Sequence, residues 1–381
     1  MGIETRKMQH VEIALKEKIE TTRKGGFEDV EFAHYSLPEI NFSDVDASVS
    51  FLKRKFSAPL MVVSMTGGFA EAEKINKHFA IAAEKENIPL GLGSQRVMLE
   101  KPGMKKTFMV RDVAPKVFLA GNIGAVQLQN YSKKQIESLV SSIEANALCI
   151  HLNPLQEAVQ HEGDKNWGGA LKQIEKVCDY LDVPVIAKET GAGINGEVAK
   201  QLEDAGVAAI DVSGVGGTSW SAIELYRKDA KAGAAFWNWG NATVDCLLEC
   251  SEMVKVPLIA SGGIRSGLDV AKSIRLGATM AGAGLPFIKA QNSGGVEGIR
   301  KEIQLWKEEL QIAMFLTRSK TLFDLKKAKL QDDCCCDEGE CCSGKECNDD
   351  EECCGGNGCK DNEDCCKGGK CCDDDCKDGK C

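Results

Sequence analysis

Four polar side chains lie within one short stretch of the chain: His151, Asn153, Gln156 and Glu157. They lie at and just beyond the end of the apolar run 147–152, which has the composition of a buried strand. Side chains alternate along a strand, so His151 and Asn153 share one side, and Glu157 can return from the following turn. Carboxylate, amide and imidazole groups can bind Mg²⁺ directly or through water. A single histidine is usually structural, but this cluster favours a metal or substrate site.

A second group of residues has the composition of a phosphate site. The stretch 261–267 reads Ser-Gly-Gly-Ile-Arg-Ser-Gly, and the stretch 281–286 reads Ala-Gly-Ala-Gly-Leu-Pro. Glycines let backbone N–H groups approach phosphate oxygens, and the start of a following helix adds partial positive charge. A tight turn would explain Gly262 and Gly263 alone. The paired loops together with Arg265 favour a phosphate, which could belong to a cofactor or a substrate.

Lys188 ends the apolar run 183–187. A lysine at the end of a buried strand must find a partner, because losing its hydration is costly. It can stabilise an anionic ligand, or it can form a salt bridge with the neighbouring Glu189.

Two further groups are weaker signals. Ser213 and Thr218 follow another apolar run and could bind phosphate, and Glu224 lies one helical turn beyond Trp220. A glycine-rich turn explains that stretch equally well.

Near the N-terminus, Arg6, Lys7 and His10 lie on consecutive turns of an expected helix and suit an anionic group. Taken alone, these three residues would be read as surface charge.

Eight short apolar runs must position these groups. Continuous apolar runs suit strands buried on both faces, and the segments between them have helical spacing. Eight such units predict an α/β fold, a (β/α)8 TIM barrel, with a doubly wound open sheet as the alternative. Barrel enzymes carry their catalytic groups after the strands, where seven of these runs have polar clusters. The runs are 59–65, 88–92, 117–120, 147–152, 183–187, 208–212, 256–260 and 279–285.

The runs divide the chain into three parts. Residues 1–57 form an N-terminal extension with a helix near 8–19. The barrel occupies residues 58–330 and ends in a helical segment over 296–330. Residues 331–381 form a separate tail that is rich in acidic residues and cysteine.

Charge and cysteine content also separate the tail from the rest of the chain. The tail carries 17 Asp/Glu and 6 Lys, a net charge of −11. The whole chain has a formal net charge of −10, so residues 1–330 carry +1. Such a body lacks the basic footprint of nucleic-acid-binding proteins. It holds only 4 of the 19 cysteines, and neither a signal segment nor a run of 18 apolar residues occurs. We therefore expect a cytoplasmic protein without a nucleic-acid partner or membrane span.

The tail contains 15 cysteines and a twelve-residue repeat over 340–351, 352–363 and 364–375. Apart from cysteine it has no apolar residue and cannot build a core. Its thiolates could bind soft metal ions, or its cysteines could pair as disulfides. In a reducing cytoplasm we favour metal, so the tail is expected to be either disordered or organised by metal.

Taken together, the motifs resemble the FMN-dependent type 2 isopentenyl-diphosphate isomerase family. The resemblance covers about residues 5–320 in order, with the tail as its main departure. Its motifs are Arg6-Lys7-x-x-His10-x-x-Ile13-Ala14-Leu15, Leu37-Pro38-Glu39, Met65-Thr-Gly-Gly68, Gly93-Ser-Gln-Arg96, Gly121-Asn-Ile-Gly-Ala125, His151-Leu-Asn-Pro-Leu-Gln-Glu157, Gly163-Asp164, Lys188-Glu189, Gly214-Val-Gly-Gly-Thr-Ser-Trp220 and Ser261-Gly-Gly-Ile-Arg-Ser-Gly267.

The resemblance implies a barrel that binds FMN, needs Mg²⁺ and a reductant such as NADPH, and interconverts isopentenyl and dimethylallyl diphosphate. In that family reduced FMN itself acts as acid and base, and the subunits assemble as tetramers or octamers. The implied FMN ligands are Ser64, Met65, Thr66, Ser94, Asn122, Lys188, Ser213, Thr218, Gly263, Arg265, Gly284 and Leu285. The implied substrate ligands are Arg6, Lys7, His10, Ser94, Gln95, Arg96, His151 and Gln156. Glu157 would bind Mg²⁺ with Asn153 nearby, and the implied catalytic residues are Gln156, Glu224, Lys188 and His151.

Two other functions remain open at this point. An FMN-dependent α-hydroxyacid oxidase or dehydrogenase would use the same barrel and phosphate loops, but it needs a histidine base near strands six and seven. No histidine follows His161. Alternatively, the chain could be a metal-sequestering protein that acts through its tail.

Overall fold

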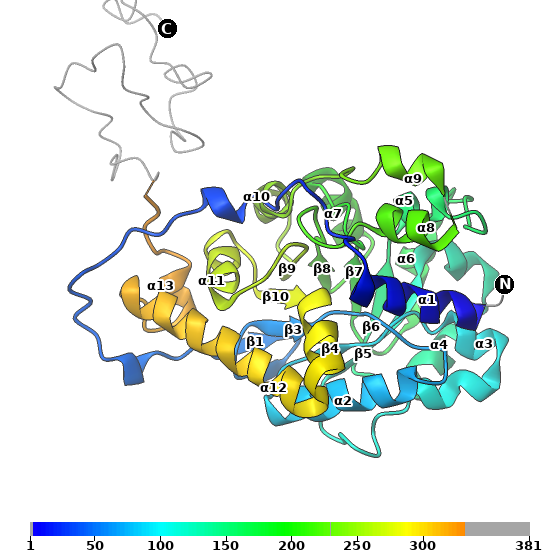
Figure 1. The fold of residues 1–381 in the computed structure, drawn as a ribbon, viewed down its shortest axis with the longest axis horizontal. Coiled ribbons are helices and arrows are strands. Elements are labelled where there is room, and N and C mark those ends of the chain that lie inside the picture. The colour runs from blue at the N-terminus through cyan, green and yellow to red at the C-terminus, as the bar shows by residue number, and fades with distance from the viewer. Residues whose placement is uncertain (1–2, 229, 332–381) are drawn as a thin grey trace, which may run out of the picture.

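The computed structural model describes residues 3–228 and 230–331, and the cysteine-rich repeats lie outside these residues. Eight short parallel strands hydrogen-bond in the closed order β10-β3-β4-β5-β6-β7-β8-β9 (Figure 1). Each strand lies within or overlaps one of the eight apolar runs, so the predicted TIM barrel is confirmed and the open sheet is excluded. The barrel strands are β3 (Leu60–Val62), β4 (Leu90–Gly91), β5 (Leu119–Gly124), β6 (Ala147–His151), β7 (Val185–Lys188), β8 (Ala209–Asp211), β9 (Leu258–Ser261) and β10 (Met280–Ala283).

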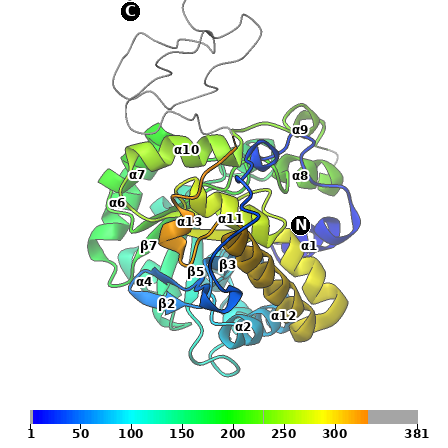
Figure 2. The same ribbon diagram turned by 90° about the vertical axis from the view of Figure 1, so that its left-hand side faces the viewer.

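Helices connect the strands and surround the barrel. Helices α2 and α12 pack side by side along one flank, and α11 packs on α12 (Figure 2). Among the described residues, no helix is long and apolar enough to cross a membrane. The helices are α1 (Ile3–Lys16), α2 (Ala72–Lys85), α3 (Arg96–Glu100), α4 (Lys133–Ser141), α5 (Pro154–Val159), α6 (Ala170–Tyr180), α7 (Gly196–Asp204), α8 (Trp220–Lys228), α9 (Lys231–Ala235), α10 (Thr243–Met253), α11 (Gly267–Arg275), α12 (Leu285–Leu316) and α13 (Leu322–Leu325).

Local sequence explains where several of these helices begin. The side chain of Asn195 accepts a hydrogen bond from the N–H of Val198 and caps α7. Ser266 caps α11 in the same way. Such caps satisfy N–H groups that have no partner inside the helix. The helices therefore start directly after the loops that follow the strands.

A small hairpin closes the end of the barrel opposite those loops. Strands β1 (Val49–Phe51) and β2 (Arg54–Phe56) pair antiparallel. Phe51 and Phe56 are 1% exposed and pack with Phe118, which immediately precedes β5. These rings join the side chains inside the barrel in one apolar cluster. The barrel is therefore a packed core that holds the opposite, polar end in place.

The N-terminal extension packs along the barrel. Helix α1, dark blue in Figure 1, packs against α8. Beyond α1, Glu20 forms a backbone bridge with Thr218 in the loop after β8. Ile19 and Phe27 belong to the main apolar core. The extension thus reaches the same end of the barrel as the polar loops.

The last long helix differs from the segment expected over 296–330. Helix α12 already begins at Leu285, changes direction at Gly295 (φ 57°, ψ −137°) and ends at Leu316. Pro286 is compatible with the first turn of a helix, where no N–H partner is needed. The Gly-rich stretch around Gly295 hides the continuity of this helix in the sequence.

Candidate active site

A cavity of about 260 Å³ opens at the carboxyl ends of the barrel strands. Its wall includes residues from α1 and from the loops that follow the strands. Nearly all the predicted site residues lie there: Arg6, Lys7, His10, Ser64, Met65, Thr66, Ser94, Arg96, Asn122, His151, Gln156, Glu157, Lys188, Ser213, Thr218, Gly263, Arg265, Gly284 and Leu285. The structure therefore brings together side chains that are far apart in the sequence.

One end of the cavity is formed by the loops after β9 and β10. Gly262 has φ +97°, and a Cβ on it would lie 2.0 Å from the carbonyl oxygen of Gly214. Helix α12 begins at this cavity without a side-chain cap on its first turn. Uncapped N–H groups at a helix start, next to glycine-rich backbone, suit a phosphate group.

Arg265 lies at the mouth of this phosphate cradle, which we define as residues 262–265 and 284–285. Its guanidinium pairs with the carboxylate of Glu20, with the Nε atom 3.1 Å from Oε1. The arginine side chain is about one-third exposed. A phosphate in the cradle could therefore use Arg265 as a charged partner at its open side.

Residues after β3 and β8 line the middle of the cavity. The Oγ atom of Ser64 is buried and has no hydrogen-bond partner. A buried hydroxyl group without a partner is costly, so a polar group of a ligand is expected beside it. Ser213 lies opposite in the barrel wall, with its Oγ atom 2.9 Å from that of Ser261. These polar groups, together with the cradle, fit the ring and the phosphate of a flavin mononucleotide.

Lys188 forms no salt bridge with Glu189. Its ammonium donates to the backbone carbonyl of Glu189. The Glu189 carboxylate instead accepts from backbone N–H groups, including those of Gly191 at 2.6 Å and Gly193 at 3.1 Å. Burial raises the pKa of Glu189, although these hydrogen bonds oppose the shift. The ammonium of Lys188 thus remains available to the cavity that it lines.

Helix α1 brings three basic side chains to the cavity wall. Lys7 donates to the carbonyl oxygen of Ser94 at 2.5 Å. Burial, helped by repulsion from Arg6, lowers the pKa of Lys7 to about 7. Burial also lowers the pKa values of Arg6 and His10. Arg6 and Lys7 are cations in a buried place, which an anion stabilises, so this wall suits a negatively charged substrate.

His151 is uncharged in this environment. Burial lowers the pKa of its imidazole to about 3, and the nearby charges of Lys188 and Lys7 act in the same direction. Its Nδ1 atom lies 2.7 Å from Oδ1 of Asn122. Asn122 therefore fixes the ring, and His151 can contribute hydrogen bonds to a ligand but no positive charge.

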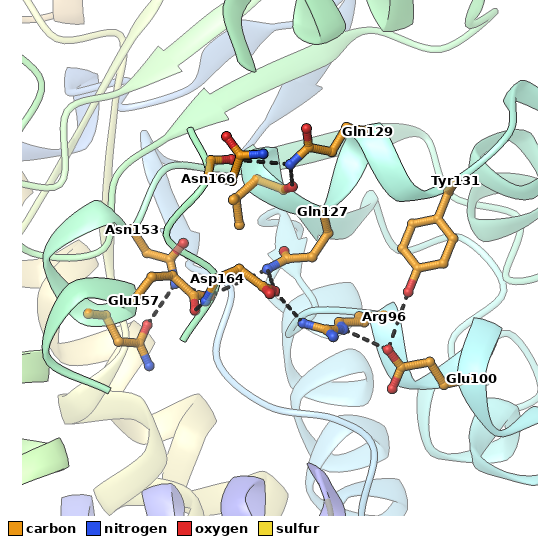
Figure 3. Close-up of polar contacts among 11 residues, drawn as sticks. Arg96, Glu100, Gln127, Gln129, Tyr131, Asn153, Glu157, Asp164 and Asn166 are labelled. Atoms are coloured by element: carbon orange, nitrogen blue, oxygen red, sulfur yellow. Dashed lines mark hydrogen bonds and ion pairs between the residues drawn. The ribbon is translucent and has the colours of Figure 1, made fainter. Parts of the chain in front are cut away.

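A cluster around Glu157 occupies another part of the wall (Figure 3). Asn153 donates to the Oε1 atom of Glu157 at 3.2 Å, and the N–H of Asp164 donates to Oε2 at 2.7 Å. Gln127 bridges the carboxylates of Glu157 and Asp164 at 3.4 and 3.1 Å. All these donors are neutral, so the charge of Glu157 has no cationic partner among these contacts.

This cluster fits Mg²⁺. The Oδ1 atom of Asn153 is buried without a partner, and amide oxygens are Mg²⁺ ligands. Within the described residues, no group of three or more His, Cys, Asp or Glu side chains could hold a metal ion. A site with one carboxylate suits an Mg²⁺ ion that keeps waters and binds the phosphates of its substrate.

Arg96 connects this cluster to the rest of the wall (Figure 3). Its Nε atom lies 2.7 Å from Oε1 of Glu100, and its Nη1 atom lies 2.8 Å from Oδ2 of Asp164. Two carboxylates thus hold the guanidinium in a fixed orientation at the cavity. The same arrangement leaves its side chain 29% exposed for an anionic ligand.

Two predicted site residues do not line the cavity. Gln95 is fully buried, donates to the carbonyl oxygen of Leu139 at 2.9 Å and accepts from the N–H of Asn122 at 2.8 Å. It supports the loops without reaching a ligand. Glu224 is 1% exposed and lies behind His10, to which it bonds at 2.9 Å.

Sequence reasoning missed three polar side chains of the cavity wall, Gln127, Gln160 and Thr190. Gln127 lies two residues beyond the matched motif that ends at Ala125. The indication in the sequence was Gly124. Its position requires a glycine, because a Cβ there would lie 1.9 Å from Oε1 of Gln127. Gln160 carried no comparable signal.

Comparison with known proteins settles the family. The model of the FMN-dependent dehydrogenase family matches residues 122–332. An isopentenyl-diphosphate delta-isomerase of Pyrococcus furiosus is 47% identical over 337 residues, which cover 85% of this chain and 86% of the relative. One of Rickettsia bellii is 47% identical over 333 residues, which cover 86% of this chain and 97% of the relative.

The chain belongs to the isopentenyl-diphosphate delta-isomerase family.

Solved structures at lower identity share the fold. A lactate oxidase of Pediococcus acidilactici has a TM-score of 0.60 at 18% identity, covering 86% of this chain and 87% of that chain. A flavocytochrome b2 with benzoylformate has a TM-score of 0.62 at 19% identity, covering 84% and 82%. At this identity the likeness shows the barrel alone. The isomerase family assignment therefore rests on the close relatives.

Proposed function

We propose that this chain binds FMN and interconverts isopentenyl diphosphate and dimethylallyl diphosphate, with Mg²⁺ and with a reductant such as NADPH. The observation that carries the proposal is one cavity with three separate parts. These are the phosphate cradle, the cationic wall of α1 with Arg96, and the Glu157 cluster. The family membership supports the same reaction.

FMN would lie with its phosphate in the cradle and its ring toward β3 and β7. Gly263, Arg265, Gly284 and Leu285 would hold the phosphate. Ser64, Met65, Thr66, Ser94, Asn122, Ser213 and Thr218 would surround the remainder, and Lys188 would face the ring. The support is that all of these residues line one cavity.

The diphosphate would lie between α1 and the Glu157 cluster. Arg6, Lys7 and Arg96 supply cations, and His10, His151 and Gln156 supply hydrogen-bonding groups. Mg²⁺ at Glu157 and Asn153 would neutralise further phosphate charge. Gln95 would act through the backbone of Asn122, since its side chain does not reach the cavity.

Moving a double bond adds a proton to one carbon and removes a proton from another. Positive charge develops on carbon beside the diphosphate, so the pocket must be dry and the diphosphate fixed. Reduced FMN, when bound, would supply the proton-transferring group. Lys188 would stabilise negative charge on the reduced ring, and the neutral His151 would orient the diphosphate without trapping it by charge.

A hydroxyacid oxidase is disfavoured by the residues of this chain. That chemistry needs a histidine base near the sixth and seventh barrel strands, and no histidine occurs after His161. The likeness to lactate oxidase concerns the fold only. An assembly as a homotetramer or homo-octamer in the cytoplasm completes the proposal and rests on the family resemblance.

A steady-state assay on purified protein tests this function. Flavin absorption should appear at one FMN per chain. Product should form only when Mg²⁺ and a reductant are both present, and removing Mg²⁺ with a chelator should stop it. Full activity with oxidised flavin, without any reductant, would contradict the proposal.

A further inference from the structure

Three elements meet behind the cavity wall and exchange charged contacts there. The Nε2 atom of His10 on α1 lies 2.9 Å from Oε1 of Glu224 on α8. The Nε atom of Arg227, one turn later on α8, lies 2.6 Å from Oε2 of the same carboxylate. The Nη2 atom of Arg227 lies 2.8 Å from Oε1 of Glu162, in the loop after α5. Arg227 therefore connects two carboxylates from different parts of the chain.

These charges lie in the interior. The side chains of Glu224 and Arg227 are 1% and 0% exposed. The contact between Nη2 of Arg227 and Glu162 has the distance of an ion pair but not the geometry of a hydrogen bond. The Nη1 atom of Arg227 has no hydrogen-bond partner. Buried ions are costly unless they are paired, and pairs of this kind are weak evidence for stability as such. A buried ion pair beside a cavity therefore calls for a functional reason.

Both oxygens of Glu224 are occupied. Oε2 accepts from Arg227, and Oε1 accepts from His10. With its amide nitrogen toward Glu224, Gln160 also donates to Oε1 at 3.1 Å and accepts from Nη1 of Arg6 at 2.9 Å. An ionised carboxylate can only accept, so Nε2 of His10 carries the proton and the lone pair of a neutral imidazole lies on Nδ1.

The surroundings keep Glu224 charged. Burial alone would raise the pKa of Glu224, but its bonds to His10 and Arg227 lower it below the ordinary value. The other charged groups around α8 are Arg6 on α1, Glu157 on α5, Glu162, Lys228, and Lys231 on α9. Two neutral residues that line the cavity touch Glu224: His10 through Nε2 and Gln160 through its amide nitrogen.

We propose that Arg227 is a positioning residue for the isomerase reaction: it holds Glu224 as a carboxylate, which in turn fixes His10 at the cavity wall and ties α1 to the barrel. This proposal rests on the proposed function for its catalytic consequence. In this arrangement Glu224 lies behind the cavity wall and acts on the substrate site through His10. His10 is held further by an edge-to-face contact with Trp220, with ring centroids 5.3 Å apart.

A double-mutant cycle tests whether Arg227 acts through Glu224. The four proteins are wild type, Arg227→Gln, Glu224→Gln and the double variant. Arg227→Gln should lower kcat by at least about tenfold, because a small misplacement of a group that positions the substrate can cost about 10²-fold. In the Glu224→Gln background the same change should have less than about a twofold effect, because coupled residues are not additive.

Two variants provide the matched comparisons. Arg227→Lys keeps the charge and should recover most of kcat with a wild-type acid limb in the pH profile. Arg227→Gln removes one of the two partners that oppose the effect of burial on the pKa of Glu224, so its acid limb should move to higher pH. Lys228→Gln removes the neighbouring cation, which contacts Glu162 at 3.2 Å but not Glu224, and should leave kcat unchanged.

Hydrogen exchange of residues 3–16 gives a readout that does not depend on activity. Exchange in α1 should be faster in Arg227→Gln and Glu224→Gln, with no further increase in the double variant. If wild type lacks isomerase activity, the proposed function fails, and this exchange cycle still decides the role of Arg227. If Arg227→Gln does not fold, the cycle is run with Arg227→Met, which removes the charge and keeps most of the length of the side chain.

The proposal is overturned by additive effects of the two substitutions on kcat and on exchange. It is also overturned if Arg227→Lys and Arg227→Gln lose the same activity with an unshifted acid limb, because that result indicates a packing role only.

Discussion

Lys7 shows how burial at one residue can create pH dependence. Its ammonium donates to a backbone carbonyl, and burial lowers its pKa to about 7. In the free protein the charged and neutral forms are therefore both populated near neutral pH. A diphosphate favours the charged form, so binding should take up a proton when the pH is above this value.

The sign of the effect follows directly. As pH rises through about 7, Lys7 of the free protein loses its proton, and kcat/KM for the diphosphate should fall. Lys7→Arg keeps the charge over this range, because arginine stays protonated. The variant should therefore lose this part of the alkaline limb. A limb that is identical in Lys7→Arg would show that another group titrates.

Lys188 should act on turnover. Lys188→Ala removes a cation beside the reduced flavin, and we expect kcat to fall by about 10²–10³-fold, as for other fixed groups that stabilise charge in a dry site. FMN content should stay close to wild type. Lys133→Ala, a substitution of an exposed lysine paired with Glu137, is the control. Wild-type turnover by a folded, FMN-loaded Lys188→Ala protein would refute this role.

Sequence alone predicted most of the cavity wall but not what lies behind it. Motifs at strand ends could be placed because parallel strands end together at one edge of a barrel. Gln95 and Glu224 carry the same kinds of side chain, yet they point into packed interior. Whether a side chain faces a ligand or a neighbour depends on its rotamer and on contacts from distant segments, which no spacing rule contains.

At the scale of elements, the loop after β8 packs against the phosphate cradle by close backbone approach. A Cβ on Gly217 would lie 2.9 Å from the backbone nitrogen of Gly263 and 3.6 Å from Nη2 of Arg265. The φ angle of Gly217 is not in the left-handed region, so a substitution would act mainly through space. A substitution of Gly217 therefore tests the packing of the cradle without adding backbone strain.

Gly217→Ala should weaken FMN binding. The added methyl group would displace the backbone of Gly263 or the side chain of Arg265, both of which line the phosphate end. The measurement is flavin absorbance per chain after dialysis. Gly103→Ala is the matched control, since nothing lies within 4 Å of its Cβ. Equal FMN content in the two variants would show that Gly217 does not support the cradle.

The strands were predictable and the long helix was only partly so. Eight apolar runs separated by helical segments leave few folds other than a closed parallel barrel. Helix α12 begins eleven residues before the expected segment, because Pro286 and Gly295 both read as breaks in the sequence. Proline is tolerated in the first turn of a helix, and a single glycine is tolerated at a kink. The sequence therefore predicted a later start for α12 than the structure has.

At the scale of the whole molecule, the barrel and the tail have different chemistry. Residues 332–381 of the tail lie outside the described residues, and its 15 cysteines and 17 carboxylates are known from the sequence. Like-charge repulsion disfavours free thiolates there, and bound metal ions remove that penalty. We propose that the tail binds soft metal ions independently of the barrel chemistry.

Deleting residues 331–381 should leave kcat and FMN content unchanged. It should also remove most of the zinc or copper from protein purified under reducing conditions. Elemental analysis of the full chain and of the deletion protein makes the comparison. Metal-free full-length protein with all tail cysteines paired would contradict the proposal and favour disulfides.

The central claim is that this barrel uses a flavin for a reaction without net oxidation or reduction. The most direct measurement is an anaerobic assay in which the bound FMN is reduced once by light, and isopentenyl diphosphate is then supplied in large excess with Mg²⁺. We expect many molecules of dimethylallyl diphosphate per flavin while the absorption spectrum stays that of reduced FMN. Product limited to one molecule per flavin, with reoxidation of the FMN, would contradict it.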